Sequence, residues 1–287
     1  PQIYCSMSTN ISQPVFSCEF FPPKTDTGME KLLVAQKKLL ATMKPEFFSV
    51  TFGAGGSTRD RTLKTVKQLQ TNGSSIAPHI SCMGSTRQQL SDVLDAYIKM
   101  DVVRLVVLRG DIPEQGSTDS GLANANELVT FIREKTGDHF HIEVAAYPEY
   151  HPESTSPDDD FKYFLNKVEA GANSAITQYF YNIDAYSQFM DKCIKANLDI
   201  PVVPGIMPIT NYANLTRFSD NCGAEIPRWI RKQLAAYEND PESLHAFGTD
   251  VVVDLCAALI EAGAPGLHFY TLNQADATLN IWNQLNS

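Results

Sequence analysis

The chain lacks the sequence patterns that mark a metal site, a disulfide framework or a serine nucleophile. Its six cysteines are scattered without any C-x-x-C pair, so neither a zinc site nor a set of disulfides is indicated. The histidines and carboxylates lack the H-x-x-x-H type of ligand spacing, and no G-x-S-x-G motif is present. We therefore expect no bound metal. A cysteine nucleophile would need a histidine that only the fold could bring beside it.

Positive charge and long apolar runs are also scarce. Lys and Arg number 23 against 33 Asp and Glu, which gives a net charge of −10 and argues against nucleic acid or an anionic membrane as partner. The longest apolar run, 251–260, is interrupted by Asp254 and predicts a buried helix rather than a membrane span. The first residues lack the layout of a signal peptide. A cytoplasmic protein is expected, in which any anionic ligand meets a local basic site.

What the sequence does contain is a regular alternation of short strand-like runs and amphipathic helix-like stretches. Such alternation is typical of a parallel sheet, and the number and spacing of the runs predict an α/β fold, a (β/α)8 TIM barrel forming a single catalytic domain over 1–287. The expected strands are 15–20, 47–51, 76–81, 102–108, 141–146, 174–178, 202–206 and 266–271. The expected helices are 29–43, 58–71, 86–99, 124–135, 157–170, 183–196, 212–220, 241–262 and 275–285, and an extra segment is expected at 227–238, before the long apolar helix.

Glu19 stands out because it lies within an otherwise apolar, strand-like run, 15–23, that ends in two prolines. A carboxylate in such a setting either finds a partner or shifts its pKa upward and keeps its proton. A carboxylic acid that is protonated near neutral pH can act as a general acid. The alternative, that Glu19 lies on a solvated strand face, is equally compatible with this segment alone.

Polar side chains recur at the carboxyl ends of the expected strands, where barrel enzymes place their active sites. Strand alternation turns Ser17 and Glu19 toward the barrel interior and leaves apolar residues for the helices. Singly, each polar residue has a structural explanation: His79 as a core histidine, Arg109 with Asp111 as an ion pair. Together they predict one polar mouth that holds an organic cofactor. The strand-end residues are Glu19, Thr51, His79, Ser81, Arg109, Gly110, Asp111, Tyr147, Glu149, His151, Gln178, Tyr270, Thr271 and Asn273.

Several of these residues belong to longer motifs that occur in order along the chain. They are Glu19-Phe20-Phe21-Pro22-Pro23-Lys24, Ala77-Pro78-His79, Leu108-Arg109-Gly110-Asp111, Ala145-Ala146-Tyr147-Pro148-Glu149, Ile176-Thr177-Gln178, Pro204-Gly205-Ile206-Met207-Pro208 and His268-Phe269-Tyr270-Thr271-Leu272-Asn273. With these motifs the chain resembles the methylenetetrahydrofolate reductase family, in its short bacterial form, over nearly its whole length. The absence of further sequence after the barrel is unlike the eukaryotic members, which carry a regulatory domain.

The resemblance implies a flavoprotein in which NADH or NADPH reduces bound FAD. The reduced flavin would then convert 5,10-methylenetetrahydrofolate to 5-methyltetrahydrofolate, with the two substrates taking turns (ping-pong), in one-carbon metabolism and methionine synthesis. By the same resemblance Glu19 would assist opening of the folate ring to the iminium. Asp111 would lie between flavin and folate, where its charge favours that cation.

The resemblance also implies binding residues. For FAD they are Thr51, Phe52, Ala54, His79, Arg109, Gly110, Asp111, Ala125, Tyr147, His151, Asp160 and Lys167. For the folate they are Glu19, Asp111, Gln178, Asn214, Phe218, Leu272 and Gln274. Three of the chain's residues depart from the family pattern: Asn166 and Gln274 stand where arginine is frequent, and Asn214 where glutamine is frequent.

Two other functions stay open at this point. One is another flavin-dependent barrel oxidoreductase, similar to proline dehydrogenase, and the other is a folate- or flavin-binding protein without turnover. The sequence does not choose between NADH and NADPH, because it contains no ribose-recognition motif of the usual dinucleotide fold. A homo-oligomer is expected from the resemblance alone.

Overall fold

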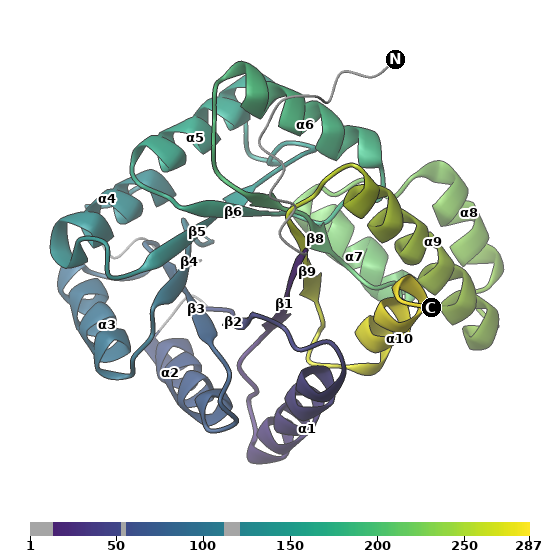
Figure 1. Cartoon of the computed structure of the whole chain (residues 1–287), viewed down its shortest axis with the longest axis horizontal. Helices are drawn as coiled ribbons and strands as arrows, with labels where there is room; N and C mark the ends of the chain where they lie inside the picture. The colour runs from purple at the N-terminus through teal and green to yellow at the C-terminus, as the bar shows by residue number, and fades with distance from the viewer. Residues whose placement is uncertain (1–13, 53–55, 112–120) are drawn as a thin grey trace.

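A computed structural model describes residues 14–52, 56–111 and 121–287 of the chain. Of the residues singled out by sequence, Ala54 lies outside the described ranges. Within them, all strands are parallel and helices follow strands in regular alternation. The helices form an outer ring around the strands (Figure 1).

The sheet closes into a barrel. The strands are β1 (Val15–Phe20), β2 (Phe47–Val50), β3 (Ile76–Ser81), β4 (Arg104–Leu108), β5 (His141–Ala146), β6 (Ser174–Thr177), β7 (Val202–Val203), β8 (Gly205–Ile206) and β9 (Gly266–Tyr270). Their order is β7-β6-β5-β4-β3-β2-β1-β9-β8. Because only Pro204 separates β7 from β8, the two edges of this order belong to one stretch of chain, which pairs with β6 on one side and β9 on the other. The (β/α)8 prediction is confirmed.

The expected strand 202–206 is divided because proline has no N–H to give to a neighbouring strand. Pro204 instead accepts a hydrogen bond at its carbonyl from the main-chain nitrogen of His268, at 2.9 Å. The ring is thus continuous through Pro204, although the regular ladder is not.

The helices lie within a few residues of the expected ranges. They are α1 (Asp26–Thr42), α2 (Gly56–Gln70), α3 (Arg87–Lys99), α4 (Ala125–Thr136), α5 (Pro157–Glu169), α6 (Ile183–Lys195), α7 (Tyr212–Cys222), α8 (Arg228–Ala236), α9 (Pro241–Glu261) and α10 (Asp276–Leu285). Local signals explain several ends: Ser156 caps α5 by accepting from the main-chain nitrogen of Asp159, and Gly223 ends α7 in the left-handed conformation.

Helix α9 is long and apolar enough to cross a membrane by length and composition. In the barrel it lies in the outer ring, where it packs against α10, α8 and α6. Val252, Cys256 and Leu259 are fully buried there. The expectation that 251–260 forms a helix is confirmed, and one side of this helix is buried while Asp254 and Ala257 are exposed.

Strand alternation divides the side chains as expected. Cys18, Phe20, Phe48 and the other helix-facing residues of the strands belong to the large core between sheet and helices. A separate small cluster fills the barrel interior and consists of Phe47, Ala77, Val106 and Ile176, with Leu108 packed against it. Polar side chains occupy the interior on both sides of this cluster, and those at the carboxyl ends of the strands form the candidate site.

Candidate active site at the carboxyl ends of the strands

A central cavity of about 410 Å³ opens at the carboxyl ends of the strands. It brings together side chains that sequence reasoning assigned to a common mouth, from strands far apart in the chain. Those predicted residues are Glu19, Thr51, Phe52, His79, Tyr147, Gln178, Phe218 and Tyr270. Their position in one cavity agrees with the prediction, while the role of each stays a prediction.

Glu19 is held at the end of β1 by pairing on both sides, with Ser49 of β2 and Tyr270 of β9. The hydroxyl of Thr271 donates to the main-chain carbonyl of Glu19 at 2.6 Å. The amide of Asn273 binds both main-chain groups of Phe21, at 2.9 and 2.8 Å. Thr271 and Asn273, expected at the mouth, therefore fix the chain on which Glu19 is mounted.

The carboxyl of Glu19 has the properties of an acid that keeps its proton. Its side chain is 21% exposed, toward the cavity. Burial nevertheless raises its pKa to about 8, because removal from water penalises the charged form. At neutral pH the cavity thus contains a neutral carboxylic acid, which the sequence predicted on the basis of its apolar surroundings.

His79 is the nearest titratable neighbour of Glu19, with Nε2 lying 3.4 Å from Oε2. Burial, together with the nearby His268, lowers the pKa of His79 to about 3. The contact therefore joins two neutral groups at pH 7 and is not an ion pair. Nε2 of His79 is buried and has no hydrogen-bond partner, which is costly unless a ligand supplies one.

His268 also lines the central cavity, although sequence reasoning assigned it no role. Its Nδ1 lies 2.7 Å from the Ser17 hydroxyl and its Nε2 lies 3.4 Å from that of Ser49. Burial lowers its pKa to about 4, so it is neutral. Strand alternation could have found it, because His268 and Tyr270 are two residues apart on β9 and face the same side.

A second cavity, of about 330 Å³, adjoins the first and shares Leu108, Ala145 and Tyr147 with it. Besides Tyr147, seven residues expected to bind a cofactor line this second cavity: Arg109, Gly110, Asp111, Ala125, His151, Asp160 and Lys167. Asp111 was expected in the same mouth as Glu19. The structure places it in the second cavity, where it is exposed.

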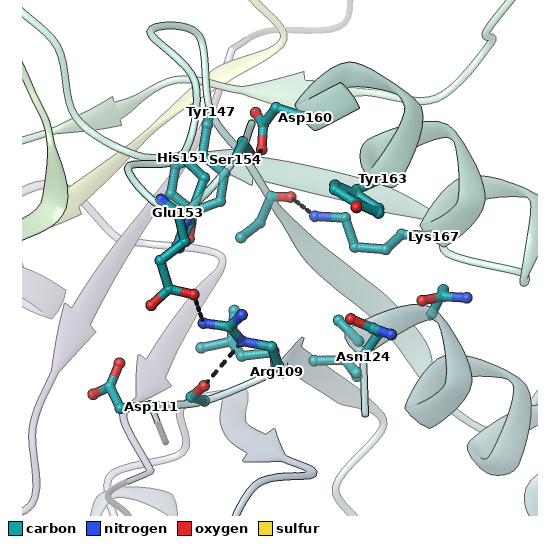
Figure 2. A pocket seen from close by; sticks show the side chains of 16 residues that line it. Arg109, Asp111, Asn124, Tyr147, His151, Glu153, Ser154, Asp160, Tyr163 and Lys167 are labelled. Atoms are coloured by element: carbon teal, nitrogen blue, oxygen red, sulfur yellow. Dashed lines mark hydrogen bonds and ion pairs between the residues drawn. The ribbon is translucent and has the colours of Figure 1, made fainter. Parts of the chain in front are cut away.

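The second cavity contains two cations whose surroundings differ (Figure 2). Nη2 of Arg109 pairs with Oε2 of Glu153 at 2.6 Å. Nζ of Lys167 donates to the carbonyl of Ala145 at 2.5 Å. Burial lowers the pKa of Lys167 to about 8, against the opposing effect of Asp160. Lys167 therefore keeps its proton at neutral pH, and together with the guanidinium of Arg109 it allows this cavity to meet an anion.

His151 lines the second cavity. Burial, and then the charge of Arg109, lowers its pKa, so its ring is neutral at neutral pH. Its Nδ1 accepts from the main-chain nitrogen of Glu153 at 3.1 Å, and its ring meets that of Tyr147 edge to face at 4.8 Å. It therefore orients Glu153 and Tyr147 at the junction of the two cavities.

Three residues expected to bind the folate lie outside the linings of both cavities: Asn214, Leu272 and Gln274. Asn214 is exposed in the first turn of α7, where its main-chain nitrogen donates to Asn211 at 2.8 Å. Leu272 packs against the main core, and Gln274 is exposed in the turn after β9. Lining residues that sequence reasoning missed include His268, Tyr179, Cys222, Glu153, Ser154 and Tyr163.

A closed parallel barrel with a neutral acid and a cationic cavity at its carboxyl-terminal mouth defines a barrel protein with the features of an enzyme site for an anionic organic ligand. The sequence profile of the family described as Methylenetetrahydrofolate reductase matches residues 6–286. The chain belongs to this family.

Individual relatives agree with the family match. The chain is 38% identical to the 5,10-methylenetetrahydrofolate reductase of Pectobacterium carotovorum over 94% of its own length and 89% of the relative's. It is 37% identical to that of Escherichia coli over 94% and 90%. Among solved structures, an uncharacterized protein from Clostridium thermocellum, described as binding two copies of 5-methyl-5,6,7,8-tetrahydrofolic acid, superposes with a TM-score of 0.66 at 15% identity and covers 96% of this chain and 95% of its own. This last likeness shows the fold alone.

Proposed function

We propose that the protein reduces 5,10-methylenetetrahydrofolate to 5-methyltetrahydrofolate, with FAD as cofactor and NADH or NADPH as hydride donor. The observation that carries the proposal is Glu19, a neutral carboxylic acid at the end of β1 in a cavity that joins a second, cationic one. Membership of the family supports the substrate and product. A cytoplasmic location and a homo-oligomeric assembly stay predictions from the sequence.

The described residues fit a flavin dinucleotide in their chemistry. The orphaned Nε2 of His79 is a buried ring nitrogen in want of a polar partner, which a heterocyclic ligand in the central cavity would offer. The second cavity presents Arg109 and Lys167, which match a diphosphate. Thr51, Phe52 and Tyr147 line the central part, while Gly110, Ala125 and Asp160 line the cationic part. When bound, the flavin would accept hydride from the nicotinamide and deliver it to the folate.

Glu19 would act on the folate rather than on the nicotinamide. As an acid with a pKa of about 8, it can donate its proton to a ring nitrogen of methylenetetrahydrofolate, which opens the five-membered ring to the iminium cation. The neutral His79 beside it adds no positive charge that would oppose this cation. The negative charge of Asp111, in the adjoining cavity, would favour the same cation over a longer distance.

The aromatic and amide side chains around Glu19 would orient the substrates. Gln178 and Phe218 line the central cavity on the side of β6 and α7. An amide can pair with the hydrogen-bonding edge of a pterin, and a phenyl ring can stack on either a pterin or a nicotinamide. Since both substrates need the same surface, they would bind in turn. Asn214, Leu272 and Gln274 are proposed only as contacts to the folate tail beyond the cavity.

The test separates the two half-reactions. The purified protein should be yellow, or should take up FAD, and anaerobic NADH or NADPH should bleach it. In a Glu19→Gln variant, reduction of the flavin should proceed as in the wild type, while reoxidation by methylenetetrahydrofolate should slow by about 10²–10⁴-fold. A protein that binds no flavin would refute the proposal. Equal loss in both half-reactions would refute the role of Glu19.

A further inference from the structure

Tyr163 is an aromatic residue of the second cavity for which neither the fold nor the proposed chemistry has a use. It lies on α5, 55% exposed, and lines the cavity together with Lys167. Two neighbouring aromatic residues of the same helix are used in packing: Phe161 and Phe164 contact Phe189 at ring distances of 5.7 and 5.1 Å. Tyr163 makes no such ring contact in the described part of the chain. Its ring is therefore available to a ligand.

The position of Tyr163 on the helix ties it to the anion-binding end of the cavity. Residues three and four apart on a helix are neighbours on its surface, so Asp160, Tyr163 and Lys167 form one stripe along α5. All three line the cavity, and Figure 2 shows the Tyr163 ring and the Lys167 side chain at the same end of it. A flat ring thus lies one helical turn from the ammonium group that would meet a phosphate.

Asparagine amides line the same cavity from another element. Asn124 and Asn126 lie at the start of α4 and line the cavity with Tyr163. Asn124 serves as the N-cap residue of α4 without making a side-chain cap hydrogen bond, and its Nδ2 donates to Oε1 of Glu127 at 3.3 Å. A carboxamide can both donate to and accept from the edge of an adenine ring. An exposed aromatic face, amide edges and a nearby cation are together the chemistry that recognises an adenosine diphosphate group.

We infer that Tyr163 is the stacking platform for the adenine of FAD and sets the preference of this protein for FAD over FMN. The inference rests on the proposed function, because it assumes that a flavin occupies the joined cavities. FAD carries the adenosine part and FMN lacks it, so only FAD gains from the ring. An adenine is also present in NADH, but the cavity that holds Tyr163 is lined by the residues proposed for the resident cofactor. The adenine that stacks on Tyr163 is therefore that of FAD and not that of NADH.

The experiment measures the dissociation constants of FAD and FMN for the flavin-free full-length chain by flavin fluorescence. Stacking of a base on an aromatic side chain is worth about one to two powers of ten in affinity. Tyr163→Ala should therefore weaken FAD about tenfold or more and leave FMN within about twofold. Tyr163→Phe, which keeps the ring, should bind both flavins nearly as the wild type does. Trp229→Ala, at another exposed aromatic, on α8, which meets Phe247 edge to face, is a control outside both cavities and should change neither.

Three results would overturn the inference. They are an unchanged FAD affinity in Tyr163→Ala, an equal loss for FAD and FMN, and a loss of affinity for NADH in the flavin-loaded variant without a change in the FAD to FMN ratio. A wild-type chain that binds neither flavin would overturn the proposed function as well. A wild-type chain that binds both, with a ratio indifferent to Tyr163, would overturn the inference alone.

Discussion

At the scale of single residues, burial shifts two adjacent groups in opposite directions and makes both of them neutral. It raises the pKa of Glu19 to about 8 and lowers that of His79 to about 3. Desolvation always disfavours the charged form, so an acid keeps its proton and a base loses its own. The pair offers a proton donor without an adjacent fixed cation, which suits a reaction whose intermediate is itself a cation.

The pKa of Glu19 predicts a pH dependence confined to one half-reaction. Because this pKa is raised, the acid form is present below about pH 8 and is lost as the pH rises through that value. Single-turnover reoxidation of the flavin by methylenetetrahydrofolate should thus fall about tenfold per pH unit above pH 8. Reduction by NADH should lack this inflection. Stopped-flow absorbance between about pH 6 and 10 would measure both. The same inflection in Glu19→Gln would show that another group titrates.

Glu19 could be identified from the sequence as a candidate acid, because a carboxyl within an apolar strand is visible from the neighbouring residues alone. Sequence reasoning also placed Thr51, His79 and Gln178 in the central cavity, since strand ends meet at one edge of a barrel. It placed Asp111 at the same mouth but did not assign it to the adjoining second cavity, because which strand ends share a cavity depends on the packing of side chains between them. Tyr163 was missed because one exposed tyrosine on a helix carries no sequence signal.

At the scale of elements, the strands and helices were predictable because each has a clear period and local end signals. The interruption between β7 and β8 is caused by Pro204. That a proline interrupts the hydrogen bonds between strands could be predicted from the sequence. The close approach of Gly205 to Thr177 and Tyr270, on neighbouring strands, could not be predicted from the sequence. A Cβ built at Gly205 would lie 2.2 Å from the carbonyl oxygen of Thr177 and 2.6 Å from the ring of Tyr270.

We therefore expect Gly205→Ala to strain the barrel where β8 approaches β6 and β9. The main-chain nitrogen of Gly205 donates to the Thr177 hydroxyl at 2.9 Å, and the Tyr270 hydroxyl donates to the Thr177 carbonyl at 2.7 Å. The backbone oxygen cannot move aside cheaply, so the free energy of unfolding should fall by about 3 kcal/mol. Urea denaturation would measure it.

The control for this prediction is Gly73→Ala. A Cβ there would meet nothing within 4 Å, although the φ of +77° carries its own cost, about 1–2 kcal/mol. Flavin affinity should fall in Gly205→Ala and not in the control, because Tyr270 lines the central cavity. If the free energy of unfolding of Gly205→Ala were no lower than that of Gly73→Ala, β8 could move away from β6 and β9 without cost, and the prediction would be wrong.

At the scale of the whole molecule, titratable groups gather at both ends of the barrel interior, and the two sets differ in kind. At the amino-terminal end, Arg104 pairs with the buried Glu143 at 2.5 Å and with Glu46 at 2.6 Å. Glu143 also accepts from the Ser174 hydroxyl at 2.5 Å. These groups are satisfied, whereas His79 at the carboxyl-terminal end is not. In this fold the amino-terminal end of the barrel contributes stability and the carboxyl-terminal end carries the active site. The paired charges at the first end and the unpaired His79 at the second agree with this division.

The amino-terminal network predicts a loss of stability without a loss of function. Burial by itself raises the pKa of Glu143, but hydrogen bonds from His141 and Ser174 and the charge of Arg104 outweigh it and lower the pKa overall. Glu143→Gln would leave Arg104 with a buried neutral partner, and the free energy of unfolding at pH 7 should fall by about 3–5 kcal/mol. Glu46→Gln removes the other partner of the same arginine. Since Glu46 is 45% exposed, its loss should cost only about 0–1 kcal/mol.

The sign of the pH effect follows from the lowered pKa. A carboxyl whose pKa is lower in the folded chain adds stability above its ordinary pKa of about 4.3, and that stability is lost as the pH falls through the folded value. The gap between the wild type and Glu143→Gln should therefore be full at pH 7 and should shrink in acid toward about pH 3. Urea denaturation at both pH values would measure it. The dissociation constant for FAD should be unchanged, because Glu143 lines neither of the two cavities. Equal costs for Glu143→Gln and Glu46→Gln, or weakened FAD binding in a stable Glu143→Gln protein, would contradict this separation of the two ends.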